Sequence, residues 1–275
     1  MKYLVFKLQT YFLLSSSMIL MGLATSAQAF QLDFTGMVTG DLTNSNSDNN
    51  GATLRFGDVA TDGETTLDLV ITALDTYTLV NASNNGQAGS LNAGQINIAR
   101  GTSNRFGFQF VEAGTDTPFS ASSVEFDFYD IDSNGVSREF VTLSTDATYE
   151  VSDPGGLNIT TTDGEVTFTP QALGEVPNLT NVSNPTSAQE DVSVSLQFSN
   201  ISSFELTFGD DDPVAQPFAA GRNVFFTSQL IFSDPTTTEN FQPVPFDFSP
   251  TLGLLLSGLG ILGVKSFRKQ AKFTK

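Results

Sequence analysis

Apolar and polar residues alternate with a period of two along most of the chain between residues 30 and 235. In residues 106–110 and 204–208, phenylalanine or leucine recurs at every second position, and residues 192–198 alternate valine, leucine and phenylalanine with polar residues. Successive side chains of a β-strand point to opposite faces, so this pattern predicts strands with one buried face. Residues 223–232 are more continuously apolar, which predicts a central strand covered on both faces.

Shorter alternations between turn signals predict further strands. Asn-Gly and Asp-Gly pairs, such as Asp163-Gly164, favour tight turns, and no window of the body shows a helical stripe. Frequent turns between short strands predict an all-β fold, an antiparallel β-sandwich of jelly-roll type over residues 30–235 with a linker over 236–245. The additional strands are expected at residues 31–35, 53–56, 66–72, 95–99, 124–128, 140–143, 148–151, 158–161 and 165–169.

The first 29 residues have the three parts of a secretory signal. A short basic start precedes a mostly apolar stretch over residues 8–23, and Ala27 and Ala29 form a small-x-small cleavage site. This layout predicts an N-terminal signal helix that is removed on export, leaving Phe30 as the mature N-terminus. An uncleaved membrane anchor is the alternative.

The C-terminal residues 246–275 combine an uncharged apolar segment with a basic end. Residues 251–264 carry no charge, and five cations follow them. As a helix with a rise of about 1.5 Å per residue, this segment spans about 21 Å, less than the roughly 30 Å of a hydrocarbon core. We therefore expect a short C-terminal transmembrane helix, with the basic end in the cytoplasm and the acidic body outside.

The entry into this segment carries a recognisable motif. Phe248-Ser249-Pro250, followed by Gly253 and the apolar run, resembles the cyanobacterial-type variant of the PEP-CTERM sorting signals. The resemblance covers about 30 residues, and the Pro-Glu-Pro triplet itself is absent. It implies processing by an exosortase-type enzyme and association with cells that produce exopolysaccharide. An ordinary single-span anchor is the alternative.

The charge of the body is strongly one-sided. All 30 acidic residues lie between Asp33 and Asp247, and the same stretch holds five arginines and no lysine. Such a body repels phosphate backbones, which argues against a nucleic-acid partner. Divalent cations and polysaccharides are compatible partners, and solubility outside the cell is the simplest role of the charge.

The missing residue types exclude several kinds of site. The chain contains no cysteine, histidine or tryptophan. A Ser-His-Asp or Cys-His nucleophile cannot be built, nor can a zinc site of cysteine or histidine ligands. Carboxylate and carbonyl chemistry remains, so we expect no certain cofactor, calcium as a candidate one, and no enzymatic activity.

Residues 130–135 match the first half of a calcium-binding loop. Asp130, Asp132 and Asn134 alternate before Gly135, as oxygen ligands and a turn glycine do in such loops. The twelfth position is Val141 rather than a bidentate glutamate, so Glu139 is the candidate fourth ligand. The pattern favours a polar hairpin turn without a metal, and bound calcium is the alternative.

The sequence also predicts the surroundings of three other sets of side chains. Asp210, Asp211 and Asp212 are adjacent carboxylates, which favours a solvated turn, with calcium binding as the alternative. Arg222 is expected to anchor a carboxylate internally. Tyr129 falls on the face opposite to the neighbouring phenylalanines, so we expect it to be exposed.

The body also faintly resembles β-sandwich modules of bacterial surface and adhesin-like proteins. The residues that carry this are 54–59, 63–70, the Phe-rich strand ending at Asp132, and 221–226. The resemblance implies no specific activity. We expect an exported surface or extracellular-matrix protein with a structural or adhesive role. A Ca²⁺-dependent carbohydrate-binding module and a carboxylate-based glycan hydrolase are the alternatives.

Overall fold

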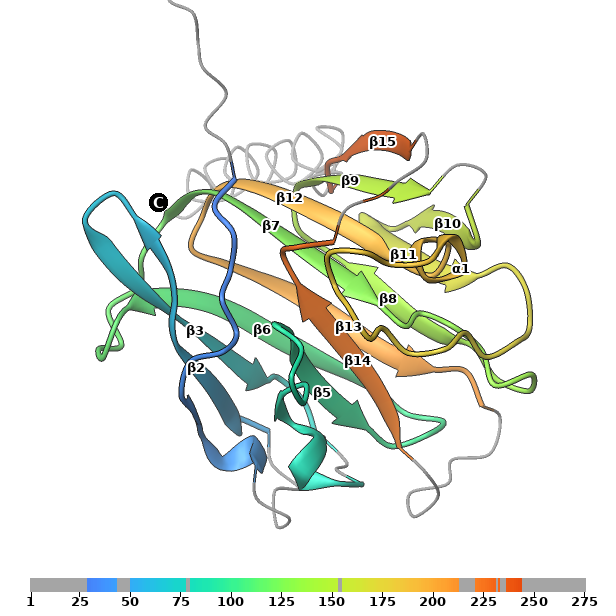
Figure 1. Ribbon diagram of the computed structural model, residues 1–275, viewed down its shortest axis with the longest axis horizontal. Coiled ribbons are helices and arrows are strands. Elements are labelled where there is room, and N and C mark those ends of the chain that lie inside the picture. The colour runs from blue at the N-terminus through green and yellow to red at the C-terminus, as the bar shows by residue number, and fades with distance from the viewer. Residues whose placement is uncertain are drawn as a thin grey trace, which may run out of the picture.

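Two antiparallel β-sheets form the body of the protein (Figure 1). The computed structural model describes residues 29–43, 50–77, 80–152, 155–212, 221–230, 232 and 236–243. Most of the expected signal segment, with Ala27, and all of the expected sorting tail, with Phe248, Ser249, Pro250 and Gly253, lie outside these residues. Within them, no helix is both long and apolar enough to cross a membrane.

The larger sheet has eight strands, and the smaller has seven. Neighbouring strands are often far apart in sequence, so the order along each sheet is not the order along the chain. The larger sheet runs β1 (Val38–Thr39), β2 (Thr53–Asp62), β3 (Thr65–Ala73), β6 (Ser103–Glu112), β13 (Ser203–Asp210), β8 (Glu139–Leu143), β11 (Glu165–Pro170), β10 (Leu157–Thr162). The smaller runs β15 (Thr236–Phe241), β9 (Ala147–Ser152), β12 (Val194–Ile201), β7 (Ala121–Tyr129), β14 (Arg222–Thr227), β5 (Gly94–Ile98), β4 (Gly86–Gln87).

Helical structure in the described residues is limited to single turns. These are two 3-10 turns, η1 (Asp41–Thr43) and η2 (Ala82–Asn84), and the α-helical turn α1 (Ser187–Glu190). A capping box closes the start of α1, where the Thr186 N–H donates to Gln189 Oε1 at 2.9 Å. The expectation of an all-β fold with antiparallel sheets is therefore confirmed, whereas the jelly-roll connectivity stays a prediction.

Phenylalanine rings from both sheets meet in one core. Phe108 of β6 is fully buried and lies 4.9 Å from Phe204 of β13, ring centroid to ring centroid, in a stacked arrangement. Across the core it contacts Phe126 of β7 at 5.9 Å and Phe226 of β14 at 5.8 Å, both edge to face. Aromatic pairs favour such offset and edge-to-face geometry, so the alternation seen in the sequence builds an interlocked aromatic core.

The strand expected at residues 31–35 is wrong. Leu32 and Phe34 are fully buried, which explains the alternation, but no ladder forms there. The Leu32 N–H donates instead to Ser228 Oγ, and the Phe34 N–H donates to Asn92 Oδ1 at 2.6 Å. Alternating burial therefore arose here from a segment that enters the core without joining a sheet. At the other end of the body, the region expected as a linker begins with strand β15, which pairs with β9.

Tyr129 is buried, contrary to the exposure expected from its place on the outer face of β7. It is 2% exposed, and its ring stacks on Phe225 with centroids 5.0 Å apart. Residues 171–186, here called the strap, lead from β11 to α1 and supply Leu179 and Val182 to this second apolar cluster. A loop that covers the outer face of a sheet left no periodic signal, which is why the alternation alone misplaced Tyr129.

Candidate functional site: a buried carboxylate cluster around Arg222

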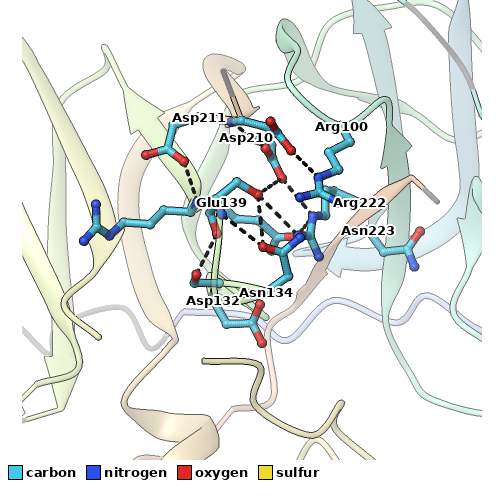
Figure 2. Close-up of polar contacts among 12 residues, drawn as sticks. Arg100, Asp132, Asn134, Glu139, Asp210, Asp211, Arg222 and Asn223 are labelled. Carbon is cyan, nitrogen blue, oxygen red and sulfur yellow. Dashed lines mark hydrogen bonds and ion pairs between the residues drawn. The ribbon is translucent and has the colours of Figure 1, made fainter. Parts of the chain in front are cut away.

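Three strand ends bring acidic side chains together at one end of the body. Glu139 begins β8, Asp210 ends β13, and the two face each other in the register of the larger sheet. Arg222 begins β14 in the smaller sheet, and Asp130 follows the end of β7. Figure 2 shows Arg222 pointing into the group formed by Glu139 and Asp210. This arrangement is the most concentrated set of buried charges among the described residues.

Arg222 is the cation at the centre of the cluster. Its Nε atom lies 2.8 Å from Asp210 Oδ2 and 3.4 Å from Glu139 Oε1. The exposed fractions of the three side chains are 14% for Arg222, none for Asp210 and 7% for Glu139. Burial alone would lower the pKa of Arg222, but the charges of Glu139 and Asp210 outweigh it and raise that pKa. The expected internal role of Arg222 is confirmed.

The solvated turn expected at Asp210, Asp211 and Asp212 is wrong for two of its three residues. Asp210 and Asp212 are buried, and Asp211 is exposed. Asp210 Oδ1 accepts from the Asp212 N–H at 2.8 Å, and the Asp212 carboxylate pairs with Arg100. The run of like charges is tolerated because two arginines from other parts of the chain neutralise it, which sequence adjacency could not reveal.

Asn134 belongs to the hairpin turn. Its Oδ1 atom accepts from the N–H groups of Val136 and Ser137, both at 3.0 Å. Gly135 follows with a φ of 85°, a left-handed conformation that suits glycine. The side chain thus closes its own turn, as asparagine commonly does. The proposed calcium ligand set therefore has its Asn134 oxygen already engaged in this structure.

Asp130 and Asp132 hold the strap. Asp132 Oδ2 accepts from the Val176 N–H at 2.6 Å, and the Asn178 amide, in its favoured orientation, donates to the Asp130 carboxylate at 3.2 Å. Burial, with the charge of Asp132 added, raises the pKa of Asp130 to about 7. Burial also raises the pKa of Asp132. Both carboxylates are therefore desolvated without an arginine in direct contact.

Glu139 has one oxygen without a hydrogen bond. Its Oε2 atom is buried and finds no partner among the described residues, while Oε1 faces Arg222. Burial, followed by the charge of Asp130, raises the pKa of Glu139 well above its ordinary value. Asp130, Asp132 and Glu139 are thus brought into one electrostatic neighbourhood, although nowhere in the described parts do three acidic side chains converge as metal ligands. Calcium at Asp130, Asp132, Asn134 and Glu139 stays a prediction.

A second carboxylate pair lies on the outer face of the smaller sheet. Glu125 and Asp127 are two residues apart on β7 and so share a face. Asp127 is fully buried, and its Oδ2 atom accepts from the Leu230 N–H at 2.8 Å. Its Oδ1 atom and Ser195 Oγ on β12 form no hydrogen bond of normal geometry with the described residues. The sequence signal for this pair was the Glu-x-Asp spacing inside a strand, but its burial needed the segment around Leu230.

Asp127 should make stability depend on pH. Burial, and then the charge of Glu125, raises the pKa of Asp127 well above its ordinary value. A carboxyl group with a raised folded-state pKa contributes stability at low pH and loses it as the pH rises through that pKa. Asp127→Asn cannot ionise and keeps an acceptor for the Leu230 N–H. We expect it to match the wild type at about pH 4 and to unfold at a higher temperature than the wild type at about pH 8.

Thermal unfolding across this pH range is the measurement. Asp146→Asn, at an exposed position on the connection before β9, is the matched control and should follow the wild-type curve. If Asp127→Asn kept the pH dependence of the wild type, the buried carboxyl would not be its source.

Comparisons with known proteins identify similar solved structures but no family. No family model matches the chain, and neither does any curated protein. Among solved structures, the N-terminal domain of the Streptococcus gordonii adhesin Sgo0707 is similar, with a TM-score of 0.41 and 12% identity over 70% of this chain and 46% of that chain. The adhesin domain of PrgB from Enterococcus faecalis has a TM-score of 0.37 and 13% identity over 70% of each chain. This chain thus spans less than half the length of the first of these structures. At these scores the likeness carries no functional weight, and the chain's own residues must indicate its role.

Proposed function

We propose that the protein is an exported surface or extracellular-matrix protein with a structural or adhesive role. The observation that carries this proposal is the pairing of two sequence patterns in one chain. Residues 1–29 have the basic, apolar and small-x-small parts that we interpret as a secretory signal, and residues 246–275 have the apolar segment and basic end that we interpret as a sorting tail. The tail resembles the PEP-CTERM signals, so we expect an exosortase-type enzyme to recognise and process it. Until it is processed, the short apolar segment holds the chain in the membrane with the acidic body outside.

The body supports this role by the way its charges are placed. Some buried carboxylates are neutralised by arginines, as Asp210 is by Arg222, and exposed ones such as Asp211 keep the surface acidic. The core is closed by phenylalanine rings without any cysteine, so its folding needs no oxidising machinery. Such a domain suits a hydrated, polyanionic or carbohydrate-rich layer. Its net negative charge keeps it soluble there and opposes nonspecific association with other anionic molecules.

Mass spectrometry of the protein isolated from its own host tests the sorting proposal. We expect a mature N-terminus at Phe30 and a C-terminus upstream of Thr251. A chain that still ends at Lys275 would contradict processing and favour a plain anchor. Replacement of Ser249 and Pro250 by alanine is the matched variant, because it removes the motif while keeping the apolar length.

A second candidate function is a Ca²⁺-dependent carbohydrate-binding module. The observation that favours it is the buried, unpartnered Oε2 atom of Glu139 beside Asp130 and Asp132. Carboxylate oxygens are the ligands that calcium takes, and excess negative charge in the cluster would be relieved by a divalent cation. Asn134 would have to leave its turn, or its place would be taken by a water molecule.

Calcium titration distinguishes this second candidate. A ligand that binds the native state alone raises stability, by about 2.7 kcal/mol at a hundredfold excess over Kd. The midpoint of thermal unfolding should therefore rise with calcium in the wild type and stay constant in Glu139→Gln. A wild-type midpoint that calcium leaves unchanged would rule the calcium site out, and a glycan array with and without chelator would test sugar binding.

A further inference from the structure

The four edges of the two sheets are protected unequally. β1 and β4 are two residues long, and β15 carries Glu239, whose carboxylate accepts from Tyr149 Oη at 2.6 Å. β10 is six residues long, Leu-Asn-Ile-Thr-Thr-Thr, and contains no charge, proline or bulge. Exposed edges are normally guarded by charges, proline, bulges or short length, because unpaired backbone groups template further strands. In the described part of the protein, β10 is the long edge that lacks all these guards.

The hairpin between β10 and β11 fixes which backbone groups point outward. Asp163 and Gly164, with φ values of 53° and 80°, form the two-residue turn, and Thr162 pairs with Glu165. Hydrogen-bonded and non-hydrogen-bonded pairs alternate along an antiparallel ladder, so Thr162, Thr160 and Asn158 bond to β11. The N–H and C=O groups of Thr161, Ile159 and Leu157 therefore face away from the sheet.

One of these outward positions is already occupied. The Leu157 carbonyl accepts from Gln171 Nε2 at 3.0 Å. The backbone groups of Ile159 and Thr161 have no such partner among the residues that the structure describes. Two residues spaced by one, each offering a donor and an acceptor, form a self-complementary set. A second β10, laid antiparallel with its Thr160 opposite Thr160, would pair each Ile159 with the other copy's Thr161 and make four hydrogen bonds.

We propose that β10 is a homophilic docking edge, through which two copies of this chain pair antiparallel about Thr160 and join their eight-stranded sheets into one. This proposal rests on the edge alone and goes beyond the surface role proposed above. It would stand whether or not the tail is processed.

The self-complementary backbone groups of β10 select a second copy as the occupant, and the lack of charge on β10 permits its approach. The body carries 30 acidic residues against five arginines, so most approaches of two copies bring carboxylates together. β10 is free of charge, and in this register Asp163 falls opposite Leu157 of the other copy rather than opposite a carboxylate. Ile159, which is partly exposed and packs on the core, would gain cover. The remaining long-range repulsion is screened by salt, so pairing should strengthen as ionic strength rises.

Cysteine cross-linking in the full chain tests the register, because the chain has no cysteine of its own. Directly opposed residues of a non-hydrogen-bonded pair have Cα atoms about 4.5 Å apart, within the range of a disulfide. Thr160→Cys should therefore form a covalent dimer under mild oxidation. Thr162→Cys is the matched control, since it is also exposed on the same face but would lie about 14 Å from its counterpart, at about 3.4 Å per residue.

Thr161→Pro tests the backbone pairing. It removes an N–H group that points outward and leaves the ladder to β11 intact, as proline on an edge strand does. Added to Thr160→Cys, it should reduce cross-linking to the level of Thr162→Cys while the midpoint of thermal unfolding shows that the fold remains. Equal cross-linking of the two cysteine variants at every salt concentration, or full cross-linking despite the proline, would overturn the proposal.

Discussion

Replacing Arg222 with methionine is expected to lower the free energy of unfolding by about 3–5 kcal/mol. The substitution keeps the apolar stem but removes the cation that lies 2.8 Å from Asp210 Oδ2 and 3.4 Å from Glu139 Oε1. Asp210 is fully buried and Glu139 nearly so, which leaves both carboxylates desolvated and uncompensated. Urea denaturation monitored by circular dichroism gives the difference directly.

Arg105→Met is the matched control for Arg222→Met. Arg105 and Glu205 are about half exposed and lie 3.8 Å apart, so their loss should change stability by no more than about 0.5 kcal/mol. Adding Glu139→Gln to Arg222→Met removes one uncompensated charge and should recover part of the loss. Equal effects of the two arginine substitutions would show that the buried cluster is not the structural centre inferred here.

Phe108→Ala is expected to cost about 3–5 kcal/mol as well, for a different reason. Phe108 is fully buried on β6, and its ring contacts three rings across the sandwich, those of Phe126, Phe128 and Phe226. Truncation leaves a cavity between the sheets that rigid neighbouring rings cannot fill. The same urea denaturation measures the loss.

Two further variants serve as controls for the effect of Phe108→Ala. Met37→Ala changes a side chain that is 76% exposed and should stay within about 0.5 kcal/mol of the wild type. Phe108→Leu leaves a smaller cavity than Phe108→Ala and should cost less. If the leucine and alanine variants were equally stable, packing of this ring would not be what joins the sheets.

Strand positions could be predicted from the sequence, whereas their partners could not. Alternation predicted β6, β7, β12 and β13 because each strand has one face in the core, so that every second residue is apolar. Pairing of β13 with β6 and β8 depends on contacts between segments far apart in the chain. Residues 31–35 show the limit, because Leu32 alternates in burial without forming a ladder.

The carboxylate cluster was predictable only where its members are local. Asp130, Asp132 and Glu139 lie close together in sequence, between the end of β7 and the start of β8, so their spacing indicated a common site. Asp210 reaches Glu139 through the register of the larger sheet, and Arg222 comes from the smaller sheet. The run of aspartates gave no sign that arginines would neutralise it. Asn134 fitted a ligand pattern, but a turn asparagine has the same spacing.

The place of β14 has a consequence for how the chain can fold. β14 lies between β7 and β5 in the smaller sheet, yet it is the next-to-last strand in sequence; Figure 1 shows it in orange among strands coloured green and teal. In a chain synthesised from its N-terminus, β5 and β7 appear long before residues 222–227, so the middle of that sheet stays open until β14 has been made. Long-range closure of this kind is slow. Completion of the smaller sheet must therefore wait until β14 is available, and a chain truncated before β14 cannot complete that sheet.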